Sequence, residues 1–561
     1  MKRNKKLTVI DFFGGAGGFS EGFRQQGFEV IKGIDYWKPA VDTFNHNFGL
    51  DGESIDVLEY AEDIGKINKL PNSDIILGSP PCVSFSSSNK QGGADKTLGI
   101  SLIETFFRIV AVKKHQPNSN LKAWFMENVS NSIKHTKDAY TFAELNLTEW
   151  ANKHGLNPNS QAINFIDNHK VLSSFDFGVA QARKRLFAGE VISTGRFPDL
   201  ENKVGKTVRE IFKDFPRPFD SKQVAIDPNY PEIKLNTSEL TDHYYDTGIY
   251  KSHWDYSKYC KVNHPYMGRM SFPENLDNPS RTITATKLDN SREALIYHDE
   301  LGRVGNGQYR TPTIREIAVL MSFPITYQFI GPENSKWRLV GNAVTPLVSA
   351  AIAKATLSIL QLPLVKKPAV KLKPELDGVI NLNSSEVKLF DRALIKKPGA
   401  RFRRHPFKEG NMTVALSNYC LKQNSDSDGV WRTTVTYGTG KAYKLQEVGA
   451  SNQQEIESFI LENFDDGEDF ISVIKKDVLH RVAVSSKLQD MYEQNLYQEG
   501  ELHPVELINK VQSIIVKYAN GEMISADKIF QHKDKVYKKQ AYALYVINKI
   551  CQTINGGQYE K

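Results

Sequence analysis

Apolar runs of strand length alternate with segments of helical apolar spacing through the first 130 residues. Strands are predicted over LTVIDFF (7–13), EVIKGID (29–35), DIILGS (74–79) and AWFMENV (123–129), and helices over 19–26 and 101–114. Strands that alternate with helices predict an α/β fold with a doubly wound, mostly parallel sheet. Such sheets bind ligands beyond the carboxyl ends of their strands. Residues at those ends are therefore the first candidates for a functional site.

The chain has 561 residues, which is too long for one ordinary domain, so two or three are expected. Changes in composition divide it into a sheet-forming domain (1–188), a region rich in proline and aromatic residues (189–277), a return to the first domain (278–361), a linker rich in lysine and proline (362–375) and a separate α+β region (376–561).

Further elements are expected in the later part of the chain. They are a strand over RTITAT (281–286), a helix over 311–323 capped by Thr313, a helix over 346–360, a hairpin over 430–445 and a helix over 503–519. The region from 189 to 277 has no clear helical period.

The charge balance is mildly basic, with a formal net charge of +7, which permits a nucleic-acid partner without requiring one. Four cysteines, Cys82, Cys260, Cys420 and Cys551, lie far apart and form no CxxC pair. Their spacing argues against a zinc cluster or a disulfide framework and favours a reducing compartment. The basic N-terminus is a poor signal peptide, and no apolar stretch approaches the length that spans a bilayer. A soluble intracellular protein is predicted.

The stretch FGGAGG (13–18) joins the first predicted strand to the first helix. Glycines let a ligand approach the backbone, although this pattern is not the spaced GxGxxG of dinucleotide-binding folds. Asp35, about 20 residues further on, suits the acid that binds a ribose diol. Tyr36 could stack on an adenine, and Asp56 could accept a hydrogen bond from the adenine amine. An adenosine-bearing ligand is therefore expected, and a tight turn without a ligand is the alternative.

Cys82 follows two prolines at the end of a predicted strand. A lone cysteine is most often a small buried hydrophobic residue, whereas a nucleophile needs thiolate character that a nearby cation can promote. Arg183 and Arg185 occupy alternate positions and so share one face of an extended segment. A carboxyl group at Glu127 could hydrogen-bond a substrate base. The alternatives are a solvated basic face for the two arginines and a helix cap for Glu127.

Seven short motifs occur in a fixed order along the chain. They are FFGGAGGFS, ID near residue 35, PPC, ENV, QARKR, RTIT and GNAV. In this order the chain resembles the DNA cytosine-5 methyltransferase family of bacterial or phage restriction-modification systems, over roughly residues 7–355. The resemblance implies a Rossmann-like fold dependent on S-adenosylmethionine, with a target-recognition region over 189–277.

The resemblance also implies roles for individual residues. In the family a cysteine attacks carbon 6 of cytosine, which would be Cys82 here. Glu127 would contact ring nitrogen 3 and the exocyclic amine, while Arg183 and Arg185 would position the base and its phosphate. The residues implied to bind S-adenosylmethionine are Phe13, Gly15, Gly17, Asp35, Tyr36, Asp56 and Asn342. The family usually has glutamine after the cysteine, and this chain has Val83.

The resemblance implies that the target cytosine is flipped out of duplex DNA, because neither face of its ring can be reached inside the stack. The loop over 83–99 would cover the flipped base, with Ser86, Ser88 and Lys90 as candidate contacts. S-adenosylhomocysteine would be the product, and the chemistry needs no metal. A monomer on DNA is expected in the cytoplasm, associated with the nucleoid, with a restriction endonuclease of the same site as a candidate partner.

Aromatic and basic residues of the region 189–277 suit contact with DNA, although about half of the tyrosines could equally pack a small core. They are Tyr244, Tyr245, Tyr250, Trp254, Tyr256 and Tyr259, with Lys251, His253, Lys258 and Lys261. In the last region, basic residues at 401–405 and Lys408 could bind phosphate or form a charged loop.

Two other functions stay open: methylation of transfer RNA, and non-catalytic DNA binding on the same scaffold. A fused endonuclease is a weaker alternative, because its candidate acids show no spacing typical of a metal site. Those acids are Asp465, Asp466, Glu468 and Asp469.

Overall fold

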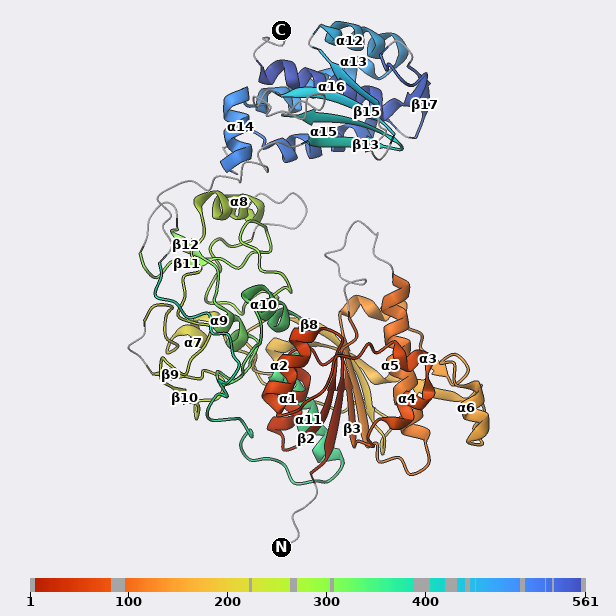
Figure 1. Cartoon of the computed structure of the whole chain (residues 1–561), viewed down its shortest axis with the longest axis vertical. Coiled ribbons are helices and arrows are strands. Elements are labelled where there is room, and N and C mark those ends of the chain that lie inside the picture. Colours follow the sequence, from red (N-terminus) through yellow and green to blue (C-terminus); the bar gives the residue numbers. More distant parts are fainter. Residues whose placement is uncertain are drawn as a thin grey trace. The chain divides into compact units, whose positions relative to one another are not determined.

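The computed structural model describes residues 6–81, 96–220, 224–262, 270–302, 307–387, 404–418, 431–438, 444–449, 451–494, 500–519, 521–526 and 529–555. The chain divides into two compact units, shown in Figure 1: Met1–Ile249 with Lys261–Leu389, and Tyr250–Cys260 with Phe390–Lys561. Residues 250–260 thus group with the second unit, although the sequence suggested an unbroken region from 189 to 277. The finer domain boundaries stay predictions.

The first unit contains a six-stranded sheet in the order β2–β1–β3–β4–β8–β7. Strands β1 to β4 are parallel, while β8 is antiparallel to both of its neighbours, so β8 alone runs against the other five. The α/β class and the mostly parallel sheet are confirmed. The strands are β1 (Thr8–Phe12), β2 (Glu29–Ile34), β3 (Ile75–Gly78), β4 (Ala123–Asn128), β7 (His169–Ser173) and β8 (Lys184–Val191).

Helices cover both faces of this sheet. Successive side chains of a strand point to opposite faces, so Ile10 and Phe12 of β1 pack under α5 (Lys96–His115), whereas Val9 packs under α1 (Gly18–Gln25) and α11 (Pro346–Ile359). Figure 1 shows α5 on one side of the strands and α1 with α11 on the other. Smaller elements of this domain are α2 (Lys38–Phe48), α3 (Glu59–Glu62), α4 (Ile64–Lys69), α6 (Thr148–Lys153), β5 (Ala139–Thr141) and β6 (Gln161–Asn164).

Helices α1 and α11 approach closely because α1 presents a glycine to α11. A Cβ atom added at Gly22 would lie 2.4 Å from the backbone nitrogen of Ala350. This contact holds α1, which directly follows the glycine-rich turn, against α11.

The rest of the first unit is built from short elements around a core that includes Ile233, Leu295 and Ile317. Thr313 caps α9 through a capping box with Glu316, as predicted. The elements are α7 (Val208–Phe212), α9 (Ile314–Leu320), α10 (Glu333–Asn342), β9 (Ala225–Ile226), β10 (Lys234–Leu235), β11 (Tyr297–His298) and β12 (Tyr309–Arg310).

Two predictions for this part of the chain are wrong. Residues 281–286 form no strand; only the preceding Ser280 makes an isolated bridge, to Gln181. A helix, α8 (Lys251–Val262), lies in the stretch where no helical period was expected. Its polar and aromatic residues do not follow the apolar spacing on which helix prediction depends.

The segment expected to be a linker packs along the first unit instead. We call residues 362–387 the strap. The backbone N–H of Ala369 donates to the carbonyl of Gln25, beside the sheet, and that of Ser384 donates to the carbonyl of Tyr244. Between them, the carbonyl of Ile380 accepts from Nζ of Lys336 at 2.5 Å. The strap therefore connects the sheet domain to the short-element region.

The second unit has an antiparallel sheet in the order β13–β14–β15–β16, followed by helices. The predicted hairpin is the β15–β16 pair and the predicted helix is α15, so both are confirmed, as is the α+β character. The elements are β13 (Arg404–Glu409), β14 (Met412–Ser417), β15 (Arg432–Tyr437), β16 (Lys444–Val448), α12 (Asn452–Asn463), α13 (Gly467–Asp477), α14 (Ser485–Gln494), α15 (Pro504–Tyr518), β17 (Met523–Ser525), β18 (Lys535–Tyr537) and α16 (Lys538–Ile554).

One stretch of the described residues, Glu333–Ile359, is long and apolar enough to meet the criteria for a membrane span. The prediction that no stretch approaches that length is therefore wrong. However, 67% of its most apolar window is buried inside the protein, and it includes α11, which packs on α1. A core helix of this length meets the same criteria.

Candidate functional site

A cavity of about 180 Å³ lies at the carboxyl ends of the parallel strands. Its walls come from the turn after β1, the β2–α2 connection, residues 79–81 after β3, the end of β4, the start of β8 and the end of α10. The predicted site residues that line it are Phe13, Gly15, Asp35, Tyr36, Glu127, Arg183, Arg185 and Asn342. Side chains that are far apart in the sequence thus meet where the sheet topology was expected to bring them.

The turn after β1 is held in an unusual backbone conformation. Phe13, Gly15 and Gly17 have φ angles of 55°, 54° and 82°. Positive φ costs little for glycine but is uncommon for a residue such as Phe13. Gly17 caps α1 and does not line the cavity; a Cβ there would lie 2.6 Å from the ring of Phe48. Gly17 therefore shapes the turn, and its predicted contact with a ligand stays a prediction.

Asp35 connects this turn to the end of β2. Its Oδ2 accepts a hydrogen bond from the N–H of Gly15 at 3.0 Å, and its Oδ1 accepts one from the N–H of Trp37 at 2.9 Å. Burial raises the pKa of Asp35, and the amide donors oppose that shift. Each carboxylate oxygen can accept more than one hydrogen bond, so Asp35 can still bind hydroxyl groups in the cavity. The adjacent Tyr36 is 60% exposed and can present its ring to a planar ligand.

Asp56 lies outside the cavity. Its side chain is exposed, and its Oδ1 accepts from the N–H of Leu58 at 3.0 Å. The preceding residue, Ile55, donates its N–H to the carbonyl of Asp35, which lines the cavity. The contact of Asp56 with an adenine stays a prediction.

Glu127 is a buried carboxyl group beside two arginines. Nε of Arg185 lies 3.1 Å from Oε1 of Glu127. Burial raises the pKa of Glu127, and Arg185 and Arg183 oppose that rise. Arg183 is also buried, and its Nη1 donates to the carbonyl of Ile283 at 3.2 Å. The two arginines both line the cavity, as their alternate positions predicted.

Cys82 lies outside the described residues, as do Val83, Ser86, Ser88 and Lys90. The chain that leads to Cys82 is described: Pro80 and Pro81 line the cavity. The carbonyl of Pro80 accepts from Nδ2 of Asn128 at 3.1 Å, which ties the end of β3 to the end of β4. Cys82 is therefore the next residue in the sequence after one that lines the cavity.

Two lining residues were missed by the sequence interpretation. Trp37 and Arg338 both line the cavity, and Cζ of Arg338 lies 4.4 Å from the centre of the Trp37 ring. Arg338 precedes Asn342 by four residues on α10, which is one helical turn. That spacing is the signal that could have identified it.

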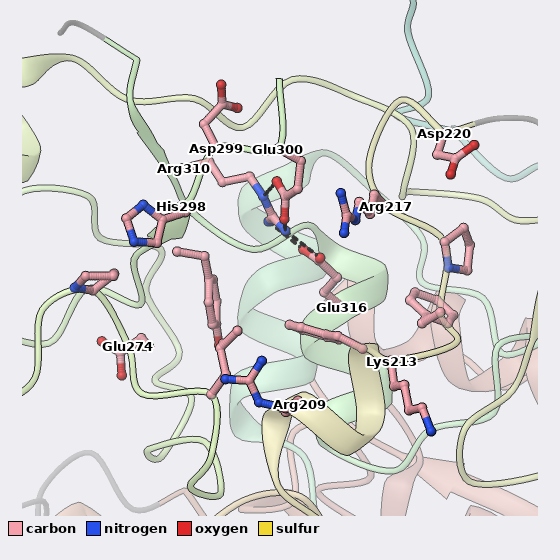
Figure 2. A pocket seen from close by; sticks show the side chains of 16 residues that line it. Arg209, Lys213, Arg217, Asp220, Glu274, His298, Asp299, Glu300, Arg310 and Glu316 are labelled. Atoms are coloured by element: carbon pink, nitrogen blue, oxygen red, sulfur yellow. Dashed lines mark hydrogen bonds and ion pairs between the residues drawn. The ribbon is translucent and has the colours of Figure 1, made fainter. Parts of the chain in front are cut away.

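A second, larger cavity of about 850 Å³ lies between α7, α9 and the β11–β12 pair. Figure 2 shows Arg310 between Glu300 and Glu316 inside it. Nη1 and Nη2 of Arg310 each lie 2.8 Å from a carboxylate oxygen of Glu316, and Glu300 accepts from Nε and Nη2. None of the predicted site residues that the structure describes lines this cavity, and the charges of Arg310, Glu300 and Glu316 pair with one another, so the smaller cavity is the candidate site.

The aromatic and basic residues of the region 189–277 separate into buried and exposed groups. Tyr244, Tyr245 and Trp254 are buried, and the hydroxyl of Tyr245 accepts from the N–H of Ile314 at 3.1 Å. Tyr259 is 42% exposed. Packing therefore accounts for part of this set, as the alternative interpretation expected.

The acidic run of the second unit is engaged in structural contacts. Asp466 accepts from Nζ of Lys538 at 2.9 Å, and Asp469 accepts from the hydroxyl of Tyr518 at 2.6 Å. The described residues contain no group of three or more histidine, cysteine or acidic side chains placed to hold a metal. Arg401 and Arg403 of the basic cluster lie outside the described residues, while His405 is buried and Lys408 is exposed.

The model of the family described as C-5 cytosine-specific DNA methylase matches residues 7–358. Type II methyltransferase M1.HphI of Haemophilus parahaemolyticus is 30% identical over 367 residues, which cover 63% of this chain and 87% of the relative. Type II methyltransferase M.AplI of Arthrospira platensis is 27% identical over 352 residues, with coverage of 62% and 85%. The solved structure of Entamoeba histolytica methyltransferase EhMeth is 15% identical with a TM-score of 0.42, and covers 64% of this chain and 99% of that one.

Proposed function

The chain belongs to the C-5 cytosine-specific DNA methylase family, and from that premise we propose its reaction and the role of each site residue. It is a DNA (cytosine-5-)-methyltransferase of restriction-modification type. We propose that it transfers the methyl group of S-adenosylmethionine to carbon 5 of a cytosine flipped out of duplex DNA. One observation supports the proposal most strongly: Glu127, Arg183 and Arg185 line the same cavity as Asp35, and Pro81, which also lines it, directly precedes Cys82 in the chain.

The cavity has groups that fit S-adenosylmethionine. Asp35 can accept from the ribose hydroxyls while it holds the turn at Gly15. Tyr36 and Phe13 offer aromatic rings for the adenine, and Asn342 lines the wall formed by α10. When bound, this molecule supplies a methyl group on a sulfonium, a good leaving group.

The first step activates a poor nucleophile. Carbon 5 of cytosine does not attack an alkyl group readily, so the Cys82 thiolate forms a bond to carbon 6 and the electrons of the 5,6 double bond become available at carbon 5. Glu127 donates a proton to ring nitrogen 3 as charge develops there. Its raised pKa supports this role, because the protonated form persists to a higher pH than in an ordinary glutamate. Arg183 and Arg185 hold the base and its phosphate.

The second step transfers the methyl group and releases the enzyme. Carbon 5 takes the methyl group, and S-adenosylhomocysteine leaves with the electron pair of the broken carbon–sulfur bond. A base then removes the proton on carbon 5, the 5,6 double bond forms again, and Cys82 is expelled as the thiolate, while ring nitrogen 3 returns its proton to Glu127. The balance is one methyl group gained by cytosine and one proton released.

Methyl transfer and covalent trapping test this proposal together. The protein should transfer labelled methyl groups to duplex DNA and form a stable complex with DNA that contains 5-fluorocytosine, because fluorine at carbon 5 blocks the last elimination. Cys82→Ala should do neither, while Cys260→Ala, which changes a half-buried cysteine of α8, should do both. Labelling retained by Cys82→Ala would refute the mechanism. Preference for transfer RNA as the methyl acceptor would favour transfer RNA methylation. Binding of DNA without methyl transfer would favour a non-catalytic DNA-binding protein. Bisulfite sequencing of DNA from an expressing host would identify the target sequence, which a cognate endonuclease would share.

A further inference from the structure

The guanidinium of Arg338 lies over the face of the Trp37 indole, with its Cζ 4.4 Å from the ring centre. A guanidinium stacked on an aromatic ring keeps its N–H donors in its own plane, where they can meet a carboxylate in a fork-shaped arrangement. Among the described residues, no hydrogen bond or ion pair involves this guanidinium. Arg338 is thus an exposed cation that stacks on Trp37, and its donors have no protein partner among the described residues.

This stacked pair belongs to the wall of the candidate cavity. Trp37 follows Asp35 and Tyr36 at the end of β2, and Arg338 shares a face of α10 with Asn342, because residues four apart lie one above the other on a helix. The positive charge of Arg338 also lowers the pKa of Asp35, against the larger effect of burial. Arg338 therefore acts electrostatically on the part of the cavity assigned to the ribose.

Three arginines line the cavity, and two are engaged. Arg185 faces Glu127, and Arg183 donates to the carbonyl of Ile283. S-adenosylmethionine carries one anionic group, the carboxylate of its methionine portion. We propose that Arg338, held in place by Trp37, binds this carboxylate. The assignment rests on the proposed function, because it takes S-adenosylmethionine as the occupant of the cavity.

The backbone amides before α1 are the competing receptor, since amides at a helix start bind anions. Three of them already have acceptors within the protein. The N–H of Gly14 donates to the carbonyl of Ile34, that of Gly15 to Asp35, and that of Gly17 to the carbonyl of Gly14. The N–H groups of Ala16, Gly18 and Phe19, which line the cavity, have no acceptor among the described residues, so the binding of ligands to Arg338→Met must decide between the two receptors.

Calorimetry with three ligands tests the assignment without relying on turnover. The probes are S-adenosylhomocysteine, its carboxamide, which keeps the amino group but has no carboxylate, and 5′-methylthioadenosine, which lacks the amino-acid portion. Arg338→Met should raise the dissociation constant of S-adenosylhomocysteine roughly tenfold or more, as for loss of a charge-assisted pair. The constants for the other two ligands should change less than about twofold. Lys38→Met is the matched control, because Lys38 is an exposed cation beside Trp37 that pairs with Asp42 and does not line the cavity.

A second variant distinguishes the effect of the Arg338 charge from that of the Trp37 ring on which it stacks. Trp37→Leu keeps Arg338 but removes the stacked ring, so a smaller loss limited to S-adenosylhomocysteine is expected. Equal losses for all three ligands in Arg338→Met, or no loss for any, would overturn the carboxylate assignment and leave the proposed function intact. Failure of the folded wild-type protein to bind any of the three would instead overturn the proposed function, and the assignment with it.

Discussion

The two cavities of the first unit both contain a buried arginine–glutamate contact, but the two contacts differ in how completely they are paired. In the larger cavity, Arg310 donates to two carboxylates and to the carbonyl of Thr311. In the smaller cavity, Oε1 of Glu127 has an arginine at 3.1 Å but accepts no hydrogen bond in the described structure. A fully paired buried charge stabilises one conformation, whereas a partly paired one has capacity left for a substrate.

The pKa directions of the two sites agree with this difference. Burial alone would lower the pKa of Arg310, but Glu316 and Glu300 more than offset burial and raise it. At Glu127, burial raises the pKa and the two arginines do not cancel the rise. The larger cavity therefore stabilises the charged form of Arg310, whereas the smaller one lets the protonated form of Glu127 persist to a higher pH than in an ordinary glutamate.

Removing the central cation of the larger cavity should produce the largest effect. Arg310→Met would leave the buried carboxylate of Glu316 and the more exposed one of Glu300 without their partner, and loss of the partner of a buried charge typically costs about 3–5 kcal/mol of unfolding free energy. Urea unfolding, followed by circular dichroism, measures the loss. Arg209→Met is the matched control, since Arg209 lines the same cavity but pairs with Asp277 at the surface, and such pairs contribute about 0–1 kcal/mol. Similar losses in the two variants would break the comparison.

Neutralising the carboxyl group of the smaller cavity should affect catalysis more than stability. Glu127→Gln removes the proton donor and should lower the rate of methyl transfer about 100-fold or more, which is the usual scale of general acid catalysis. Glu190→Gln is the control, because Glu190 is equally buried and paired, with Lys114 at 2.7 Å, but lies outside the cavity. It should lower stability and leave the rate within about twofold. The reverse pattern would contradict the functional assignment of the smaller cavity.

The same variant has a pH signature in thermal unfolding. Because the pKa of Glu127 is higher in the folded protein than its usual value of 4.5, the folded state retains a proton that the unfolded state has lost. The stability that Glu127 contributes is therefore complete below pH 4.5 and is lost as the pH rises through the raised pKa. The melting temperature of the wild type should fall relative to that of Glu127→Gln over this interval.

A smaller effect, on the affinity for S-adenosylhomocysteine, should distinguish Asp35 from Asp56, the two acids predicted to contact the adenosine ligand. Asp35→Asn weakens the anchor of Gly15 and removes charge that binds the ribose, and should raise the dissociation constant of S-adenosylhomocysteine roughly tenfold. Asp56→Asn changes an exposed residue outside the cavity and should alter the constant less than about twofold. Calorimetry measures both. A larger effect at Asp56 would place the adenine outside the described cavity wall.

The sequence predicted which residues meet in the smaller cavity best where their position depends on the sheet topology. Phe13 and Asp35 follow two different strands and Glu127 lies near the end of a third, and the carboxyl ends of parallel strands meet at one edge whatever the loops between them do. Arg183 and Arg185 were found because alternation along an extended segment is a local property. Trp37 and Arg338 were missed although each is close in sequence to a predicted residue, Tyr36 or Asn342; the contact between them joins positions 300 residues apart, and no local period reports it.

Two of the departures from prediction, at residues 281–286 and in the strap, share a physical cause: their backbone groups have partners that the local sequence does not reveal. RTITAT has strand-like composition, but the carbonyls of Ile283 and Thr284 accept from Arg183 and from the Trp337 indole. These side-chain hydrogen bonds replace the backbone hydrogen bonds that a neighbouring strand would make. The strap has the lysine and proline content of a linker, but its backbone N–H groups donate to carbonyls of the first unit. Helix α8 is a different case, because its sequence lacks the apolar spacing from which helices are predicted.

The strap sets the point at which the first unit is complete during synthesis. The family match ends at residue 358, yet the amide of Leu382 bonds to the buried Asp242, and Asn383 accepts from the N–H groups of His243 and Tyr244. A ribosome must therefore translate beyond the recognisable enzyme sequence before these interior groups have their partners. An expression boundary drawn at 361 would leave Asp242 without one of its donors, whereas a boundary at 387 keeps the strap intact.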